Sequence, residues 1–200
     1  MIRAVVLAAG QSRRMGAHKM LLPYGGKTVI AHVVDELARS SVANVVVVVG
    51  HEGKRVTEAL AELPATVVAN DEHEAGMLSS VRCGLRALGA PCEAVMVALG
   101  DQPGVTSELA DALTRAFAAT DKSIVVPVCD GKRGHPLLFS NRHCPEVLGR
   151  FNNVGLRGLL RAHPDDILEL AVPDAAALSD MDYPEDYHEA LARLEAQARQ

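Results

Sequence analysis

The chain has 200 residues and a formal net charge of −5. This acidic balance excludes a general nucleic-acid binder, which needs a basic face against phosphates, and the apolar runs are too short to span a bilayer. Hydrophobic residues make up 48% and aromatic residues only 3%, so we expect a core of Val, Leu and Ala, typical of buried parallel strands covered by helices.

Length and cysteine usage limit the organisation and the compartment. Two hundred residues suit one domain, which we assign to residues 1–200. The four cysteines are widely spaced, without C-x-x-C or Cys/His pairs at zinc-ligand intervals. Because such cysteines are typical of ordinary thiols, and the N-terminus lacks the features of a signal peptide, we predict a cytoplasmic protein.

The first predicted strand, 4–7, opens into a basic loop. Small residues at 8–10 leave room for a ligand to approach the backbone. The loop then supplies Ser12, Arg13, Arg14, Gly16 and Lys19. Backbone N–H groups and fixed positive charge predict an anion cradle, the alternative being an ordinary basic loop. Neither G-x-x-x-x-G-K-[ST] nor G-x-G-x-x-G is present.

Strands and helices alternate along the rest of the chain. Apolar runs predict further strands at 42–49, 65–69, 93–99, 123–128 and 167–172, and a hairpin turn followed by a strand within 129–139. Helical spacing predicts helices over 28–39, 53–63, 78–88, 106–119, 145–150, 155–160 and 184–198, with Thr28 as an N-cap. We therefore predict an α/β fold: a Rossmann-like, doubly wound, mostly parallel sheet with helices on both faces.

Acidic and polar residues gather where ligands bind such sheets, outside the carboxyl ends of the strands. Asp101 follows the strand at 93–99, and its carboxylate is the kind of hard oxygen ligand that Mg²⁺ prefers. The alternative role for Asp101 is to cap the next helix, for which Thr106 is better placed. Asp182 is a second candidate carboxylate and precedes the last helix. Its alternative role is a favourable interaction of its negative charge with the dipole of that helix. His73 and its acidic neighbours lie after the strand at 65–69, where a solvated loop is the alternative.

Five segments together resemble a known family. They are LAAG-x-S-x-RMG-x-x-K at 7–19, G-M-x-x-S at 76–80, G-D-Q-P at 100–103, R-G-H-P at 133–136 and D-x-P-E-D at 182–186. These motifs resemble the MobA/MocA-like nucleotidyltransferases, which include the molybdenum cofactor guanylyl- and cytidylyltransferases. The resemblance covers essentially the whole chain. One departure is Tyr183, where the family usually has Thr.

The resemblance implies roles for individual residues. It implies catalytic roles for Arg14, Lys19 and Asp101, and Mg²⁺ binding by Asp101 and Asp182. It implies that the nucleotide is bound by Leu7, Ala8, Ala9, Gly10, Ser12, Arg14, Met15, Gly16, Lys19, Gly76 and Ser80. It implies that the phosphate acceptor is bound by Gln102, Pro103, Gly134, His135 and Pro136.

The implied reaction transfers a nucleotidyl group from a nucleoside triphosphate to a phosphate with release of pyrophosphate. The cytidylyltransferase branch of the family is favoured by two segments, Ala8-Ala9-Gly10 and R-G-H-P. We therefore predict CTP as the donor, molybdopterin as the acceptor and Mg²⁺ as the cofactor. A molybdoenzyme is a further candidate partner. The alternatives are a GTP- or sugar-phosphate-using transferase, a non-catalytic carrier of the finished cofactor, and a structural protein whose basic loop pairs with acidic side chains.

Overall fold

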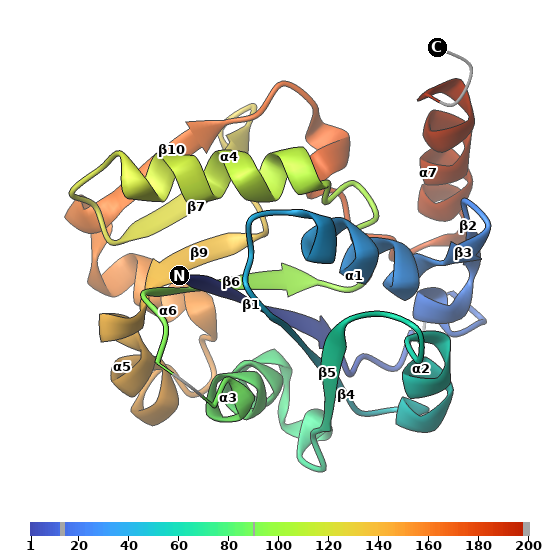
Figure 1. Cartoon of the computed structure of the whole chain (residues 1–200), viewed down its shortest axis with the longest axis horizontal. Coiled ribbons are helices and arrows are strands. Elements are labelled where there is room, and N and C mark those ends of the chain that lie inside the picture. The colour runs from blue at the N-terminus through green and yellow to red at the C-terminus, as the bar shows by residue number, and fades with distance from the viewer. Residues whose placement is uncertain (13–14, 90, 198–200) are drawn as a thin grey trace.

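The computed structural model describes residues 1–12, 15–89 and 91–197. Its centre is an eight-stranded sheet (Figure 1). The strand order is β10 (Ile167–Ala171), β7 (Ile124–Cys129), β9 (Leu137–Ser140), β6 (Ala94–Leu99), β1 (Ile2–Ala8), β4 (Val45–Val49) and β5 (Ala65–Ala69), and β8 (Lys132–Arg133) pairs with β7.

The sheet is mostly parallel, as predicted. β1 pairs in parallel with β4 and β6, β4 with β5, and β10 with β7. β9 runs antiparallel between β6 and β7. A separate hairpin is formed by β2 (Pro23–Tyr24) and β3 (Lys27–Thr28). The carboxyl ends of β1 and β6 therefore meet at one edge of the sheet, which is where ligands bind in open α/β sheets.

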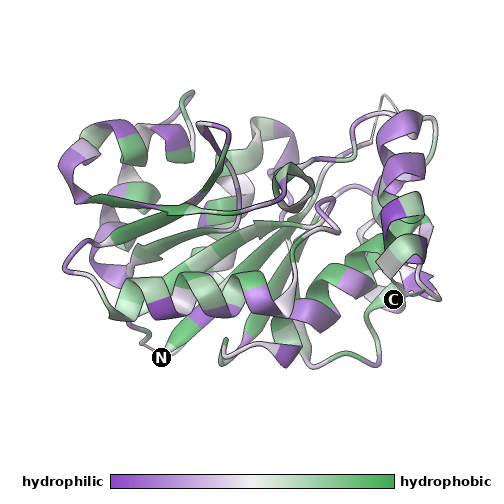
Figure 2. Cartoon of the chain, turned by 90° about the horizontal axis from the view of Figure 1, so that it is seen from above, coloured by the Kyte–Doolittle hydropathy of each residue, from purple (hydrophilic) through white to green (hydrophobic). Residues whose placement is uncertain are grey.

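Helices cover both faces of the sheet, which confirms the predicted layering. One face is covered by α1 (Val29–Arg39), α2 (Gly53–Ala59) and α4 (Ser107–Ala118), the other by α3 (Met77–Ala87), α5 (Cys144–Gly149) and α6 (Leu156–Ala162). In β1, Ala4 and Val6 pack toward the first group while Val5 and Leu7 pack toward the second, because side chains alternate along a strand. Figure 2 accordingly shows hydrophobic strands between helices of mixed character.

The last helix, α7 (Pro184–Gln197), lies at the side of the molecule next to the β2–β3 hairpin (Figure 1). Buried Tyr24, Val29 and Met181 form a small separate core there, and Tyr187, Leu191 and Leu194 of α7 pack against it. The Tyr187 hydroxyl also donates a hydrogen bond to the carbonyl of Pro23 at 2.7 Å. The C-terminal part of the chain is thereby fixed beside the segment that follows β1.

The predicted helix starts are accurate, and one predicted end is wrong. The hydroxyl of Thr28 accepts a hydrogen bond from the backbone N–H of Ala31, as that of Thr106 does from Leu109. The predicted helix over 53–63 ends at Ala59 in the structure, where successive tight turns at 60–63 lead into Pro64. A proline disfavours the helical conformation of the residue before it.

All four cysteines are free thiols, as the sequence indicated. Within the described ranges, each helix is too short or too polar to cross a bilayer.

Candidate active site

A cavity of about 520 Å³ opens at the carboxyl ends of β1 and β6. Four parts of the chain meet there: the loop after β1, the start of α3, the segment at 101 and the segment at 180–182. The lining residues are Leu7, Ala9, Gly10, Gln11, Ser12, Met15, Lys19, Met20, His73, Gly76, Met77, Ser80, Leu99, Asp101, Asp180 and Asp182. Most of the predicted nucleotide-binding and metal-binding residues are therefore brought together.

Lys19 lies between two carboxylates in this cavity. Its ammonium contacts the Asp101 carboxylate and lies 3.0 Å from Oδ1 of Asp182. The side chains of Lys19 and Asp101 are only 11% and 13% exposed, while that of Asp182 is 45% exposed. Burial lowers the pKa of Lys19, but the two carboxylates more than offset this and hold it above the ordinary 10.5. Lys19 is therefore a fixed positive charge at neutral pH.

The position of Asp101 is set by a close approach of β6 to β1. The N–H of Gly100 donates to the carbonyl of Leu7 at 3.0 Å. A Cβ at Gly100 would lie 2.6 Å from Cδ1 of Ile30 and 3.1 Å from the Leu7 oxygen, so only glycine fits. The next helix is capped by Thr106, which leaves the Asp101 carboxylate for Lys19.

The third carboxylate, Asp180, was not among the predicted site residues. Met181 is buried with Tyr24 and Val29, while Asp180 and Asp182 on either side of it line the cavity. Burial, and secondly the charge of Asp101, raise the pKa of Asp180. The alternation of two acidic residues around an apolar one is the sequence signal that could have identified it.

Asp182 was also a candidate for a purely local role at the start of α7. That role belongs to Asp186, whose carboxylate accepts hydrogen bonds from the backbone N–H groups of Asp182 at 2.9 Å and Tyr183 at 2.8 Å. This is the half of a helix capping box in which an acidic side chain in the first turn accepts from the backbone N–H of the N-cap residue. The Asp182 side chain faces Lys19 instead.

The predicted nucleotide-binding loop is only partly at the cavity wall. Ala8 is fully buried in the hydrophobic core, and Gly16 is exposed and does not line the cavity. Arg14 lies outside the described residues. Ser12 closes the loop, because its hydroxyl accepts a hydrogen bond from the backbone N–H of Lys19 at 3.1 Å.

The segment after β5 supplies the opposite wall. His73 lines the cavity and its Nδ1 lies 3.1 Å from the carbonyl of Asn70. The Asn70 amide is buried and donates to the hydroxyl of Ser80 at 3.0 Å. Glu72 and Glu74 are exposed. The solvated-loop alternative thus holds for the two glutamates and is wrong for His73, whose closeness to the cavity depends on tertiary packing.

The predicted acceptor-binding residues lie apart from the lining of this cavity. Gln102 is 2% exposed, and its amide donates to Oδ1 of Asp180 at 2.6 Å and to the carbonyl of Leu178 at 3.2 Å. Pro103 lines a second cavity, of about 760 Å³, beside α1 and α4. Gly134 and Pro136 flank His135 between β8 and β9.

His135 is electrostatically linked to the site. Burial lowers its pKa to about 4, and the negative charge of Asp101 opposes that shift only in part. His135 is therefore a neutral imidazole at neutral pH, with hydrogen-bonding capacity but no charge.

The donor set fits a divalent cation. Carboxylates of Asp101, Asp180 and Asp182 line one cavity, and hard oxygen ligands of this kind are those that Mg²⁺ and Mn²⁺ prefer. The Lys19 ammonium already lies between Asp101 and Asp182. A positive charge is thus stabilised where these two side chains converge.

Several known proteins are similar to this chain along most or part of its length. The molybdenum cofactor cytidylyltransferase of Escherichia coli is 26% identical over 193 residues, 96% of each chain. The bifunctional protein GlmU of Kineococcus radiotolerans is 35% identical over 126 residues, which are 61% of this chain and 26% of GlmU. The crystal structure of Rv0371c from Mycobacterium tuberculosis superposes with a TM-score of 0.84 at 29% identity, covering 96% of this chain and 97% of that one. A second structure of Rv0371c is a complex with manganese and superposes with a TM-score of 0.79.

Residues 4–167 match the model of the MobA-like NTP transferase domain. That range contains most of the central sheet and the loop with Lys19 as well as Asp101. Since the match covers well over half of the chain, the predicted resemblance is confirmed, and the chain belongs to the MobA-like NTP transferase family.

Proposed function

We propose that this chain is a magnesium-dependent cytidylyltransferase that transfers CMP from CTP to the terminal phosphate of molybdopterin and releases pyrophosphate. The observation that carries the proposal is the Lys19 ammonium held between Asp101 and Asp182 in the cavity at the carboxyl ends of β1 and β6. The similarity to the Escherichia coli molybdenum cofactor cytidylyltransferase along 96% of both chains supports this donor and acceptor.

The chemistry that we propose needs no protein nucleophile. An oxygen of the acceptor phosphate attacks the α-phosphorus of CTP, and the bond from that phosphorus to the bridging oxygen of pyrophosphate breaks. Lys19, with Arg14 from the same loop, would offset the charge of the triphosphate. Asp101 and Asp182 would hold Mg²⁺, whose charge stabilises the phosphate oxygens in the transition state. Lys19 would then exchange its carboxylate contacts for contacts with phosphate.

Gln102 and His135 would contribute to acceptor binding in different ways. Gln102 is buried and bonded to Asp180, so we propose that it positions that carboxylate rather than touching the acceptor. His135 is half-buried and its lowered pKa keeps it neutral, which suits a hydrogen bond to an acceptor phosphate rather than an ion pair. Acceptor contacts by Pro103, Gly134 and Pro136, a molybdoenzyme partner and a cytoplasmic location stay predictions.

Thermal unfolding with each of CTP, GTP, ATP and UTP, with Mg²⁺ and then with EDTA, tests the donor. A ligand that binds the native state raises the melting temperature with the logarithm of its concentration over Kd. We expect metal-dependent stabilisation by CTP above the other three. Stabilisation by GTP or UTP instead would retain the chemistry and change the donor, and no shift with any nucleotide would contradict the catalytic proposal and favour a carrier.

Pyrophosphate release tests the acceptor and the metal. Molybdopterin should support release, whereas sugar phosphates should not; the reverse result would assign a sugar-phosphate substrate. Asp101→Asn should abolish turnover while the circular dichroism spectrum stays unchanged. Asp121→Asn, at an exposed position on the loop before β7, is the matched control and should be fully active. An active Asp101→Asn protein would contradict the metal assignment.

A further inference from the structure

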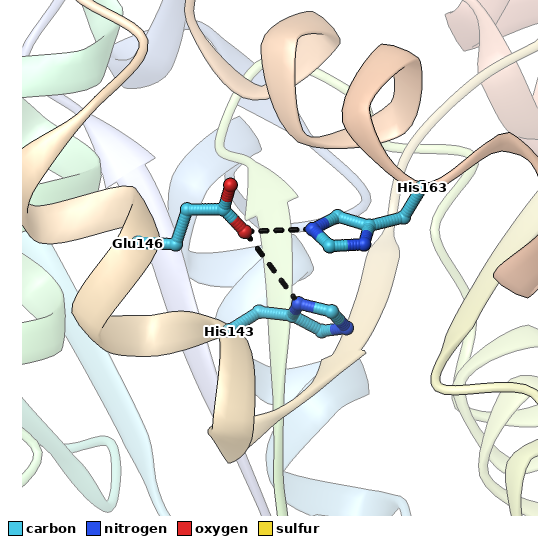
Figure 3. Close-up of side chains that lie close together, drawn as sticks. All are labelled: His143, Glu146 and His163. Atoms are coloured by element: carbon cyan, nitrogen blue, oxygen red, sulfur yellow. Dashed lines mark hydrogen bonds and ion pairs between the residues drawn. The ribbon is translucent and has the colours of Figure 1, made fainter.

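A second cluster of ionisable side chains lies at the opposite edge of the sheet from the candidate active site. His143 ends a 3-10 turn (Asn141–His143), Glu146 lies in α5, and His163 directly follows α6 (Figure 3). Ser123 and Asp166, which adjoin the cluster, immediately precede β7 and β10. The cluster is therefore at the amino ends of these parallel strands, whereas the cavity is at the carboxyl ends of β1 and β6.

One atom of each residue points toward a common centre. Nε2 of His163 lies 2.7 Å and Nδ1 of His143 lies 3.9 Å from the same carboxylate oxygen, Oε2 of Glu146. The three candidate ligand atoms all lie within 4.8 Å of one another. The imidazole rings of the two histidines face each other at a tilt of 57°, with centroids 4.6 Å apart, and Figure 3 shows the carboxylate beside both.

His143 and Glu146 also make hydrogen bonds with the polar atoms that face away from this centre. Nε2 of His143 lies 2.7 Å from the hydroxyl of Ser123, and that hydroxyl donates its single proton to Asp166. The hydroxyl therefore accepts from Nε2–H of His143, and the lone pair of Nδ1 faces Glu146. The second oxygen of Glu146 accepts a hydrogen bond from Arg150 at 3.0 Å. Such outer partners fix the orientation of metal-binding side chains.

Two arginines lie near the cluster, and both already contact carboxylates outside its centre. Arg142 contacts Oδ2 of Asp166, and Arg150 contacts Oε1 of Glu146. Neither contact uses the inward oxygen of Glu146. The exposed fraction rises from 6% for the His143 side chain to 32% for His163, so the centre is closed toward the core and reachable from the surface.

We propose that His143, Glu146 and His163 bind a zinc ion, with a water molecule as the fourth ligand. Two imidazoles and a carboxylate are a donor set typical of zinc. At a metal–ligand distance of about 2.1 Å, tetrahedral ligands are separated by about 3.4 Å. The separations of 2.7 and 3.9 Å from Oε2 of Glu146 lie on either side of that value, and the two histidine nitrogens lie within 4.8 Å of each other. Small shifts of the three side chains would therefore place all three ligand atoms around one ion.

The bound ion would connect two short helices. α5 has six residues and α6 has seven, and helices of this length depend on tertiary contacts. Zinc would add a link between them besides the packing of Val147 and Leu159 in the core. The spacing rules for Cys/His zinc ligands did not reveal this site, because one ligand is a glutamate and His163 follows it only after the whole of the next helix, α6.

Isothermal titration of the metal-stripped full chain with Zn²⁺, in excess Mg²⁺ to occupy the active-site carboxylates, tests the site. We expect one zinc ion per chain, a higher melting temperature with zinc, and the visible absorption spectrum of tetrahedral cobalt when Co²⁺ replaces it. Absence of zinc binding by the unmodified protein overturns the proposal, whether or not the protein transfers nucleotides.

Variants identify the ligands. His163→Ala should weaken zinc binding by roughly 100-fold or more, because the loss of a supporting partner alone costs roughly 10–100-fold. Ser123→Ala, which removes such a partner, should weaken it within that smaller range. His188→Ala, at an exposed histidine of α7, is the control and should bind zinc as the unmodified protein does. Unchanged affinity in both His163→Ala and Ser123→Ala would also overturn the proposal.

Discussion

Replacing Lys19 with Met should destabilise the protein through the loss of one charge. Methionine keeps an unbranched side chain of similar length but cannot neutralise a carboxylate. In the native structure the Lys19 ammonium contacts Asp101 and Asp182. The substitution therefore leaves the nearly buried Asp101 carboxylate without the cation that it contacts.

The magnitude follows from burial. Removing one partner of a buried ion pair costs about 3–5 kcal/mol, and this applies to the contact with Asp101, whose side chain is 13% exposed. The contact with Asp182, which is 45% exposed, adds about 0–1 kcal/mol. The total cost is therefore about 3–6 kcal/mol. For a chain of this size 1 kcal/mol corresponds to roughly 2–4 °C in melting temperature, so the expected loss is about 6–24 °C.

The pH at which this is measured matters. The folded-state pKa of Lys19 is raised above 10.5, so its contribution to stability is complete below the unfolded value of 10.5 and is lost as the pH rises through the raised pKa. The full difference should therefore be seen at neutral pH. It should shrink only in strongly alkaline solution.

Urea unfolding at neutral pH, first in EDTA and then in Mg²⁺, measures the effect. Lys27→Met is the matched control, because Lys27 lies 2.6 Å from Asp35 but is 44% exposed, and it should cost only about 0–1 kcal/mol. Mg²⁺ should stabilise Lys19→Met more than the unmodified protein, since the ion replaces the lost charge. The reasoning is refuted if Lys19→Met loses no more stability than the control, and the metal assignment is contradicted if Mg²⁺ stabilises both proteins equally.

Three further changes test other parts of the structure. Burial lowers the pKa of His135 to about 4. Between about pH 6.5 and about pH 4 the unfolded chain therefore binds a proton that the native state does not bind. The free energy of unfolding should fall by about 3 kcal/mol as the pH drops through that range. Urea midpoints should lose this slope in His135→Gln, and a persisting slope would assign it elsewhere. Gly134→Ala places a Cβ 2.8 Å from Cδ2 of Leu178 and should cost about 1–3 kcal/mol in thermal unfolding, an unchanged melting temperature being the contrary result. Thr106→Ala removes the hydroxyl that accepts from Leu109 and should cost about 1 kcal/mol by urea unfolding with turnover unchanged; lost turnover would show that the cap also supports the site.

Local signals predicted most of the fold. The valine run of β4 is buried along its whole length, and the caps at Thr28 and Thr106 were legible because they depend on residues only three positions apart. The insertion of β9 between β6 and β7 was not predicted. Strand order depends on pairing between distant segments, for which the sequence of one strand carries little information.

The candidate site, like the fold, was predicted from the sequence only in part. The sequence singled out Lys19, Asp101 and Asp182 as candidates, and all three line the cavity, but it did not predict that the lysine lies between the two carboxylates. It left His73 open, because a polar loop residue becomes part of a cavity only through contacts made elsewhere in the fold. Gln102 was predicted to bind an acceptor, and its burial against Asp180 is a consequence of tertiary packing.

The contact between Lys19 and Asp182 joins residues that are 163 positions apart. During synthesis on the ribosome, the strands from β1 to β10 leave the exit tunnel before the segment that carries Asp180 and Asp182. That segment is held by the hydrogen bond from the N–H of Met181 to the carbonyl of Asp101 and by the amide of Gln102. A nascent chain can thus assemble its whole sheet and still lack two of the three carboxylates of the cavity. On the proposed function, metal binding would therefore be complete only once this segment has docked, and proteolytic removal of the segment would abolish it.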